Sequence, residues 1–194
     1  MRIILASHSP RRKELLSEIF PDFEIITADT DEALFGISPR DGVRELAERK
    51  GRALLLAETS LGEDFSDSMI ISSDTLVEKD GIPYGKPKGC EDAMRMLRSL
   101  SGASHNVHTG VAVHFHGKVL SGVATTKVNF RQISDGEIEE YIATGEPMDK
   151  AGAYGIQGGA GKFVESIDGD FDTVVGLSLR LTRKLIDAML CEGK

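Results

Sequence analysis

Two adjacent arginines, Arg11 and Arg12, lie where the sequence predicts that a short apolar strand gives way to a helix. Ser9 and Pro10 are residue types preferred at the N-cap and at the first helical position, so we expect a helix that begins at Ser9 and ends at Phe20. Both arginines then occupy its first turn, at the positive end of the helix dipole. Each weakens the helix by roughly a few tenths of a kcal/mol unless an anion binds there.

A phosphate group is the anion that suits this turn. Free backbone N–H groups, the helix dipole and two bidentate donors would all point at it. The alternative is a solvated basic turn that Glu14 partly neutralises. The residues themselves leave both interpretations open.

Carboxylates gather at two further places. Asp31 and Glu32 follow an expected strand over residues 23–27, in a segment with few apolar residues, and a solvated loop pair is the alternative there. Asp74 follows the apolar run 69–71, and α/β proteins place functional groups beyond strand ends because the crevice opens there. A carboxylate at that point can hold a divalent cation or orient a water, or it can simply cap the following turn.

Lys86 stands in the short motif Gly85-Lys86-Pro87, in which glycine allows a close backbone approach and proline stiffens the exit. The motif is weak by itself. A hairpin turn expected at residues 79–81 places Lys86 and Asp74 on opposite arms, so a phosphate-binding ammonium and a cation site would face one groove.

The segment 146–161 is rich in glycine and cannot form a stable helix. It contains Lys150 and Gln157, whose ammonium and amide groups can grip a phosphate or read a base. A surface loop without function is the alternative.

The hydrophobic pattern alternates between strand and helix periods and predicts an α/β fold. Expected strands cover residues 2–6, 23–27, 69–71, 76–78, 82–84, 107–115, 118–130 and 163–167, and expected helices cover 39–58, 91–100 and 134–144. The stretch 59–68 reads as an acidic loop, and one C-terminal helix presents the apolar stripe Val174, Leu177, Leu181, Leu185 and Met189. No repeat or linker separates a second domain, so we expect one domain over residues 1–194.

The charge balance bounds the partners. With 23 basic and 31 acidic side chains the net charge is −8, which argues against general affinity for nucleic acid or an anionic membrane. The apolar runs are too short for a spanning helix or a signal peptide, and we expect a cytoplasmic protein. Cys90 and Cys191 are expected to be reduced and partly buried thiols.

The histidines give a weaker signal. His114 and His116 alternate along one expected strand and suggest a transition-metal site, but two nitrogens without a third ligand favour exposed strand residues. His105 and His108 receive the same interpretation.

Taken together, the ordered motifs resemble the Maf proteins, nucleoside triphosphate pyrophosphatases with the inosine triphosphatase-like fold. The resemblance runs from the first strand to Gly176 and is carried by residues 5–12 with 14–16, 31–32, 47–50, 73–75, 85–87, 105–111 and 146–158. It implies a mixed, elongated β-sheet flanked by helices, two lobes around a central cleft, and a homodimer.

The resemblance also implies a reaction and a set of roles. A nucleoside triphosphate would be hydrolysed between its α- and β-phosphates, giving a monophosphate and pyrophosphate. Asp74 would accept a proton from the attacking water, and Asp74 and Glu32 would hold Mg²⁺ or Mn²⁺. The triphosphate would be bound by Ser9, Arg11, Arg12, Lys50, Lys86 and Lys150.

Three positions favour the branch of the family that acts on dTTP and UTP over the branch that acts on 7-methyl-GTP: Arg11, Thr75 and Gln157. The chain departs from the family at Gly51, at the acidic insertion 62–68, at Asp172 and at Ser178, none of which is a proposed phosphate ligand. Three alternatives stay open: a nucleotide-binding inhibitor of septum formation with incidental hydrolysis, a pyrophosphatase of the 7-methyl-GTP type, and a metal-dependent hydrolase of a different phosphate ester. For a pyrophosphatase of dTTP and UTP, removal of modified pyrimidine nucleotides is a compatible cellular task.

Overall fold

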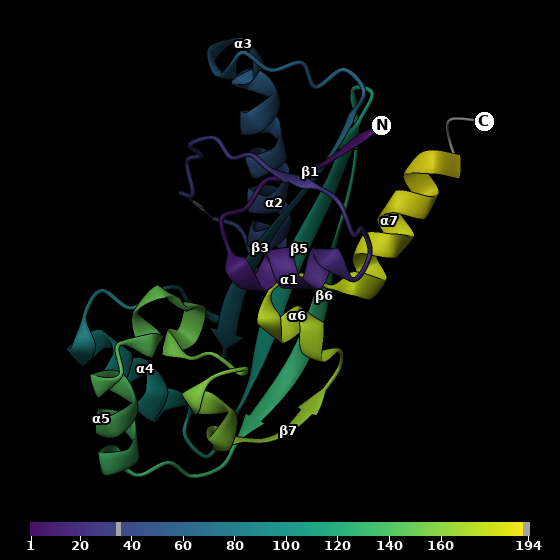
Figure 1. The fold of residues 1–194 in the computed structure, drawn as a ribbon. Coiled ribbons are helices and arrows are strands. Elements are labelled where there is room, and N and C mark those ends of the chain that lie inside the picture. Colours follow the sequence, from purple (N-terminus) through teal and green to yellow (C-terminus); the bar gives the residue numbers. More distant parts are fainter. Residues whose placement is uncertain (34–35, 192–194) are drawn as a thin grey trace. The chain divides into compact units, whose positions relative to one another are not determined.

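A mixed β-sheet organises the computed structural model, which describes residues 1–33 and 36–191 (Figure 1). In this part of the chain the strands follow the order β2-β1-β3-β5-β6-β7, and β4 pairs with β3. β1 runs parallel to β2 and β3, whereas the β3–β4 and β6–β7 pairs are antiparallel. The strands are β1 (Arg2–Leu5), β2 (Glu24–Ile25), β3 (Ser68–Lys79), β4 (Ile82–Tyr84), β5 (Ser104–Phe115), β6 (Lys118–Phe130) and β7 (Val164–Asp168). The predicted α/β class with a mixed sheet is confirmed.

Helices connect and flank these strands. They are α1 (Pro10–Ser17), α2 (Pro39–Leu56), α3 (Glu58–Leu61), α4 (Cys90–Leu100), α5 (Asp135–Ala143), α6 (Phe171–Val175) and α7 (Leu179–Cys191). Short 3₁₀ turns cover Glu146–Asp149, Ala151–Ala153 and Gly159–Phe163. The chain divides into two compact units: unit 1 comprises residues 1–74, 109–124 and the chain from Gly176 onward, and unit 2 comprises residues 75–108 and 125–175.

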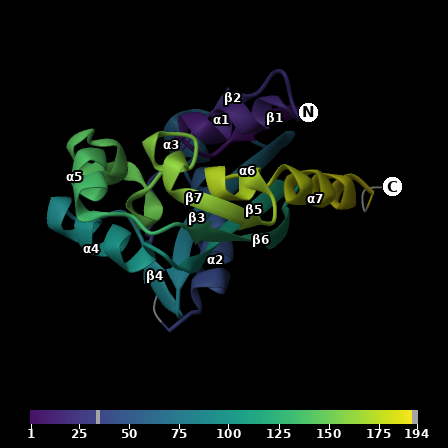
Figure 2. The same cartoon turned by 90° about the horizontal axis from the view of Figure 1, so that it is seen from below.

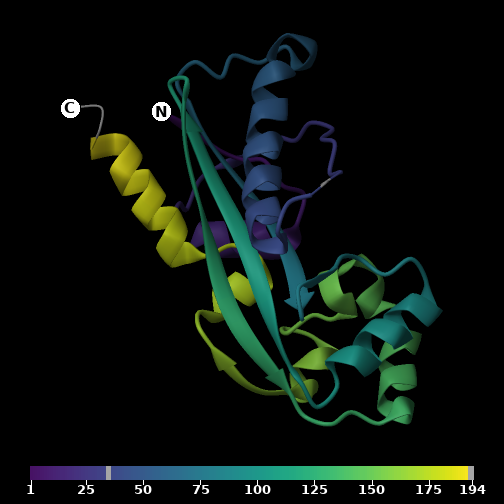
Figure 3. The ribbon, with the colours of Figure 1, turned by 180° about the vertical axis from the view of Figure 1, so that it is seen from behind.

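In unit 1, α2 lies along one side of the strands and α7 along the other (Figure 3). Ser38 caps α2 by accepting the Asp41 N–H at 3.1 Å, and Pro39 occupies the first turn. The helix is tied to the sheet because the Ser72 hydroxyl donates to the Ala47 carbonyl at 2.7 Å. On the other side, a Cβ built on Gly122 would stand 3.0 Å from Leu181, so α7 packs closely on β6.

In unit 2, α4 and α5 lie side by side and pack against each other (Figure 2). Both helices contribute buried residues to one core that contains several aromatic rings. Ser134 and Glu137 form the predicted capping box at the start of α5. The core includes Phe130, Tyr154 and Phe163, whose rings meet edge to face. This core supports the glycine-rich segment that follows α5.

Several element boundaries differ from the sequence-based expectation. α1 ends at Ser17 rather than Phe20, and Glu18 and Ile19 form a turn. Pro21 disfavours the helical conformation of Phe20, the residue before it, so the helix does not reach the predicted end. The predicted C-terminal helix is two helices, separated at Gly176, which adopts φ 131°. Ser178 begins the second one: its hydroxyl accepts the Leu181 N–H at 3.3 Å.

Three further expectations were wrong. Cys90 and Cys191 are exposed rather than partly buried. Part of the expected acidic loop is helical, because α3 covers Glu58–Leu61. His105, His108 and His114 are buried rather than exposed, since β5 is covered on both faces; only His116, at the hairpin turn, is exposed as expected.

Candidate active site

The N-terminus of α1 has the predicted architecture. Ser9 is the N-cap, with φ −66° and ψ 118°, and Pro10 opens the helix. The first turn contains no acidic residue, so Arg11 and Arg12 stand at the positive end of the helix without a carboxylate on the same turn. The Ser9 side chain makes no capping bond, which leaves its hydroxyl for other contacts.

Arg12 is anchored within unit 1. Its Nε donates to the Gly176 carbonyl at 2.9 Å, and its Nη1 donates to the Ser7 hydroxyl at 3.3 Å. The Ser73 hydroxyl donates to the same Gly176 carbonyl at 2.9 Å. One carbonyl therefore joins the first helix to the Ser73-Asp74 step of β3.

Three charged groups, Asp74, Arg11 and Glu32, lie close enough to Arg12 to shift the pKa of its guanidinium. Desolvation lowers the pKa of its guanidinium, and the Asp74 carboxylate opposes that shift. Arg11 lowers the same pKa further, whereas Glu32 raises it. A cation that is partly desolvated and held by fixed partners is well placed to bind an anion.

Lys50 joins the two predicted carboxylates. Its Nζ lies 2.6 Å from Asp74 Oδ1 and 2.8 Å from Glu32 Oε1. The side chains of Lys50 and Asp74 are 19% and 13% exposed, whereas Glu32 is 60% exposed. The ammonium and Asp74 thus form the inner part of the cluster, and Glu32 closes it from the solvent side.

Each member of this cluster comes from a different element. Lys50 is on α2, Asp74 lies within β3 rather than at the strand end that the sequence predicted, and Glu32 lies in the loop after β2. Arg49 supports that loop: its Nη1 donates to the Ala33 carbonyl at 2.9 Å and to the Asp31 carbonyl at 3.4 Å. These two bonds flank Glu32 and orient its backbone toward α2.

The pair Glu32 and Asp74 fits a hard divalent cation. Both carboxylates lie against the same positive group, because Lys50 Nζ is 2.6 Å from Asp74 Oδ1 and 2.8 Å from Glu32 Oε1. Mg²⁺ commonly uses one or two carboxylates and completes its shell with water and phosphate oxygens. Within residues 1–33 and 36–191, no group of three or more His, Cys, Asp or Glu side chains is arranged to hold a metal.

The remaining predicted residues belong to unit 2. Lys86 follows β4, is exposed, and makes no hydrogen bond or ion pair with the described residues. Lys150 donates to the Glu146 carbonyl and to Asp149, both at 2.7 Å, and its side chain is 13% exposed. Gln157 is exposed in the glycine-rich segment, and Thr75 is half-buried next to Asp74 in β3.

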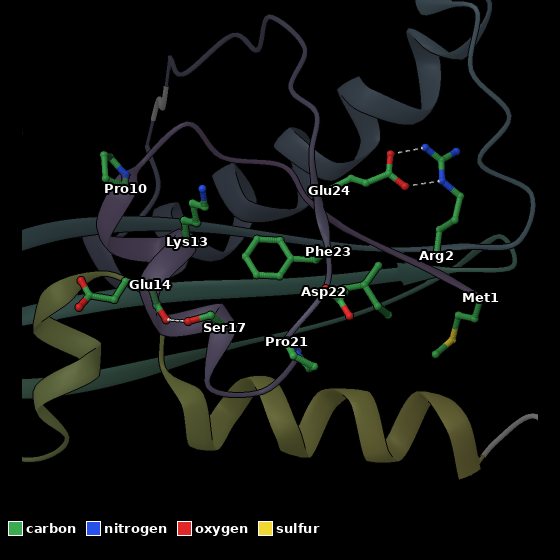
Figure 4. Close-up of a pocket in the computed structure, with 11 residues that line it drawn as sticks. Met1, Arg2, Pro10, Lys13, Glu14, Ser17, Pro21, Asp22, Phe23 and Glu24 are labelled. Carbon is green, nitrogen blue, oxygen red and sulfur yellow. Dashed lines mark hydrogen bonds and ion pairs between the residues drawn. The ribbon is translucent and has the colours of Figure 1, made fainter.

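A pocket of about 640 Å³ lies elsewhere in unit 1 (Figure 4). It is lined by Met1, Arg2, Ile3, Pro10, Lys13, Glu14, Ser17, Pro21, Asp22, Phe23 and Glu24. None of the predicted site residues is among them. Arg2 is already neutralised, because it grips both carboxylate oxygens of Glu24 at 2.9 and 2.7 Å. The pocket therefore has no part in the cluster around Lys50.

Sequence reasoning missed the groups that hold Arg12 in place. The Arg12 guanidinium donates to the Ser7 hydroxyl and to the Gly176 carbonyl, and the Ser73 hydroxyl donates to the same carbonyl. Ser7 lies two residues before Ser9, so the sequence itself indicates that it is close to the start of the helix. A backbone carbonyl from a distant residue leaves no signal in the sequence.

The fold and this cluster define an α/β protein with a basic helix N-terminus beside two carboxylates and a lysine. The family described as "Maf-like protein" matches residues 2–189, and the chain belongs to this family. Among the described residues, every helix is too short or too polar to span a membrane.

Curated relatives cover nearly the whole chain. A "dTTP/UTP pyrophosphatase" of Thermococcus onnurineus is 45% identical over 94% of this chain and 95% of its own length. Proteins with the same name from Bacillus velezensis and Alkaliphilus metalliredigens are 46% and 48% identical. They cover 95% and 92% of this chain, and 95% and 91% of their own lengths. The family resemblance found in the motifs is confirmed.

Proposed function

We propose that this chain is a nucleoside triphosphate pyrophosphatase that hydrolyses dTTP and UTP to the nucleoside monophosphate and pyrophosphate. The observation that carries the proposal is the contact of Lys50 with both Asp74 and Glu32, in the electrostatic field of Arg12. The shared name of the relatives, at 45–48% identity over nearly their full lengths, supports the same reaction.

The cationic side chains of the site bind the triphosphate of the substrate. Arg11, Arg12 and Lys50 neutralise its charge, and they stabilise the charge that develops on the leaving pyrophosphate. The Ser9 hydroxyl and the N-terminal amides of α1 add donors to the same phosphates. We propose from the sequence that Lys86 and Lys150 contact the triphosphate as well.

Asp74 is the proposed general base. A water molecule attacks the α-phosphorus and its proton passes to the Asp74 carboxylate. The bond from the α-phosphorus to the oxygen that bridges to the β-phosphate breaks, and pyrophosphate leaves with that oxygen. A carboxylate can accept this proton only if it lies within hydrogen-bond reach of the water. Asp74 is half-buried, so it is shielded yet still reachable from solvent.

A divalent cation, Mg²⁺ or Mn²⁺, would be held by Glu32 and Asp74 and would supply charge neutralisation to the phosphate oxygens. Lys50 keeps these two carboxylates close together. Removal of the metal with a chelator is expected to abolish turnover.

We assign the selection of the nucleotide base to Arg11, Thr75 and Gln157. Hydroxyl and amide groups discriminate because a ligand that leaves a polar donor or acceptor unpaired binds less well. Exchange of Gln157 for alanine is expected to change the ranking of dTTP and 7-methyl-GTP, and an unchanged ranking over a panel of nucleotides would refute the role.

We also propose that the protein works in the cytosol, where its triphosphate substrates are found, and that it forms a homodimer. The dimer is a family expectation that light scattering on the purified protein checks directly.

The Asp74→Asn variant tests the catalytic assignment. Loss of a general base is expected to lower turnover of dTTP by about 10²–10⁴-fold. Asp80→Asn is the matched control, because Asp80 is exposed in the turn after the same strand and tolerates asparagine at φ 53°. Turnover by Asp74→Asn within about threefold of the parent would refute a base of that strength.

A further inference from the structure

Glu146 makes contacts that none of the assigned roles explains. Its carboxylate accepts the Tyr141 hydroxyl at 3.0 Å through Oε1 and the Gly159 N–H at 3.0 Å through Oε2. Tyr141 is only 2% exposed, on the inner side of α5. A half-buried carboxylate with a buried hydroxyl on one oxygen and a backbone amide on the other is held in a single orientation.

Tyr141 extends this contact to a second point of the glycine-rich segment. The Gly155 N–H donates to the Tyr141 hydroxyl oxygen at 3.1 Å. Burial raises the pKa of Tyr141 well above its usual value, so the hydroxyl keeps its proton and donates a hydrogen bond to Glu146. Gly155 and Gly159 are thus both hydrogen-bonded to one Tyr141–Glu146 pair. In the sequence, Gln157 lies midway between these two glycines.

The glycines of the segment allow this approach. A Cβ on Gly158 would overlap the Glu146 carboxylate, and a Cβ on Gly155 would stand 2.7 Å from Lys150 Cε. A Cβ on Gly159 would be 3.3 Å from both Glu146 and Tyr141. The backbone therefore passes directly against these side chains, with no room for a side chain between them.

The same residue also holds Lys150. The Lys150 ammonium donates to the Glu146 backbone carbonyl at 2.7 Å. Asp149 neutralises the ammonium from the adjacent position at the same distance. Glu146 is thereby in contact with the lysine assigned to phosphate and with the segment assigned to base selection.

We propose that Glu146 is a positioning residue that fixes Gln157 relative to Lys150, and so fixes the nucleotide base relative to its phosphates. This inference rests on the proposed function for the roles of Gln157 and Lys150. Glu146 itself does not touch the reacting atoms in this account.

Amide hydrogen exchange on the full chain tests whether Glu146 holds the segment, independently of any activity. Glu146→Ala is expected to speed exchange at Gly159 by about tenfold or more, and Tyr141→Phe to do so at Gly155, because each loses its acceptor. Glu140→Ala is the control, since Glu140 is exposed on the same helix next to Tyr141. Unchanged exchange in Glu146→Ala would overturn the proposal.

Substrate selection tests whether the segment's position serves Gln157. Glu146→Ala is expected to lower the ratio of kcat/KM for dTTP over 7-methyl-GTP by about tenfold. When it is combined with Gln157→Ala, the double variant should differ from Gln157→Ala alone by less than about twofold, because both changes remove the same contact. Losses that multiply would overturn the proposal and leave Glu146 a structural residue.

The two arms separate this inference from the proposed function. A parent enzyme that releases no pyrophosphate from any triphosphate defeats the proposed function, and the exchange experiment still decides what Glu146 holds. If Glu146→Ala does not fold, Glu146→Gln replaces it. Its single carbonyl oxygen can accept only one of the two donors cleanly, so an intermediate exchange rate and an intermediate selectivity are expected. Parent-like values of both would count against the proposal.

Discussion

Arg11 and Arg12 are neighbours in sequence but differ in their surroundings. Arg12 is bonded to Ser7 and Gly176, whereas Arg11 makes no hydrogen bond or ion pair with the described residues. The Arg11 guanidinium is therefore available to an incoming anion without first breaking a bond. Arg12 contributes both to the fold of unit 1 and to the field around Asp74.

Alanine variants of the two arginines should separate these contributions. Arg12→Ala is expected to lower the Tm by roughly 3–10 °C, because it removes charge-assisted hydrogen bonds worth about 1.5–3 kcal/mol. Arg11→Ala should leave the Tm within about 1–2 °C, since it breaks no such bond. Scanning calorimetry of both variants measures the difference, and equal losses of stability would contradict the distinct surroundings.

Both variants should also bind dTTP more weakly. Loss of one arginine–phosphate contact is expected to raise the KM by about tenfold to a hundredfold. An Arg11→Ala enzyme with the KM of the parent would show that this arginine does not contact the triphosphate.

The sequence predicted the identity of these residues better than their connections. Arg11, Arg12, Lys50, Glu32 and Asp74 were recognised by residue type and by motif, and the structure brings them together in unit 1. The bonds that fix Arg12 were not predictable, because the Gly176 carbonyl is a backbone group 164 residues away. The roles of Lys86, Lys150, Thr75 and Gln157 stay predictions.

At the scale of elements, α2 shows how one glycine adapts the helix to its neighbours. Gly51 is buried in the middle of α2, where glycine costs roughly 1 kcal/mol relative to alanine. A Cβ at this position would overlap the ring of His114 and stand 3.1 Å from Ser72 Oγ. The departure from the family pattern at Gly51 is thus explained by a buried histidine on β5.

Gly51→Ala is expected to destabilise the protein by about 1–3 kcal/mol, in spite of the better helix propensity of alanine, because it overpacks the contact with His114. In a His114→Ala background the same change should be neutral or stabilising. Urea denaturation of the single and double variants measures both effects.

Gly136→Ala serves as the matched control. Gly136 is also within a helix, α5, but a Cβ there would meet nothing within 4 Å. This change is expected to raise stability by about 0.5–1 kcal/mol. An equal response of Gly51 and Gly136 would refute the steric explanation.

Elements were predictable where their signals are local. The capping box at Ser134 and Glu137 marked the start of α5, and the turn at Asp80 and Gly81, both with positive φ, marked the β3–β4 hairpin. The burial of His105, His108 and His114 could not be predicted, because β5 is buried almost continuously and shows no alternating pattern. Such a strand becomes visible only once the elements that cover it are known.

At the scale of the whole molecule, buried histidines make stability depend on pH. Burial lowers the pKa of His105 from 6.5 to about 4, and its Nε2 is bonded to the Tyr154 hydroxyl at 2.8 Å. Between these two values the unfolded chain binds a proton that the folded chain does not. Stability is therefore fully present above pH 6.5 and falls as the pH falls toward 4.

The free energy of unfolding should drop by about 1–2 kcal/mol between pH 7 and pH 5 through this group alone. His105→Gln keeps a polar group near Tyr154 but cannot titrate, so the drop should shrink by that amount. Urea denaturation at the two pH values measures the difference, and an identical drop in parent and variant would show that His105 is not its source.

The products formed from dTTP test the central claim most directly. The purified chain with Mg²⁺ should convert dTTP to dTMP and pyrophosphate in equal amounts, as chromatography of the reaction mixture would show. UTP should give UMP and pyrophosphate in the same way, and 7-methyl-GTP should react more slowly. Formation of dTDP and inorganic phosphate, or no reaction with any triphosphate and any divalent metal tested, would contradict the account.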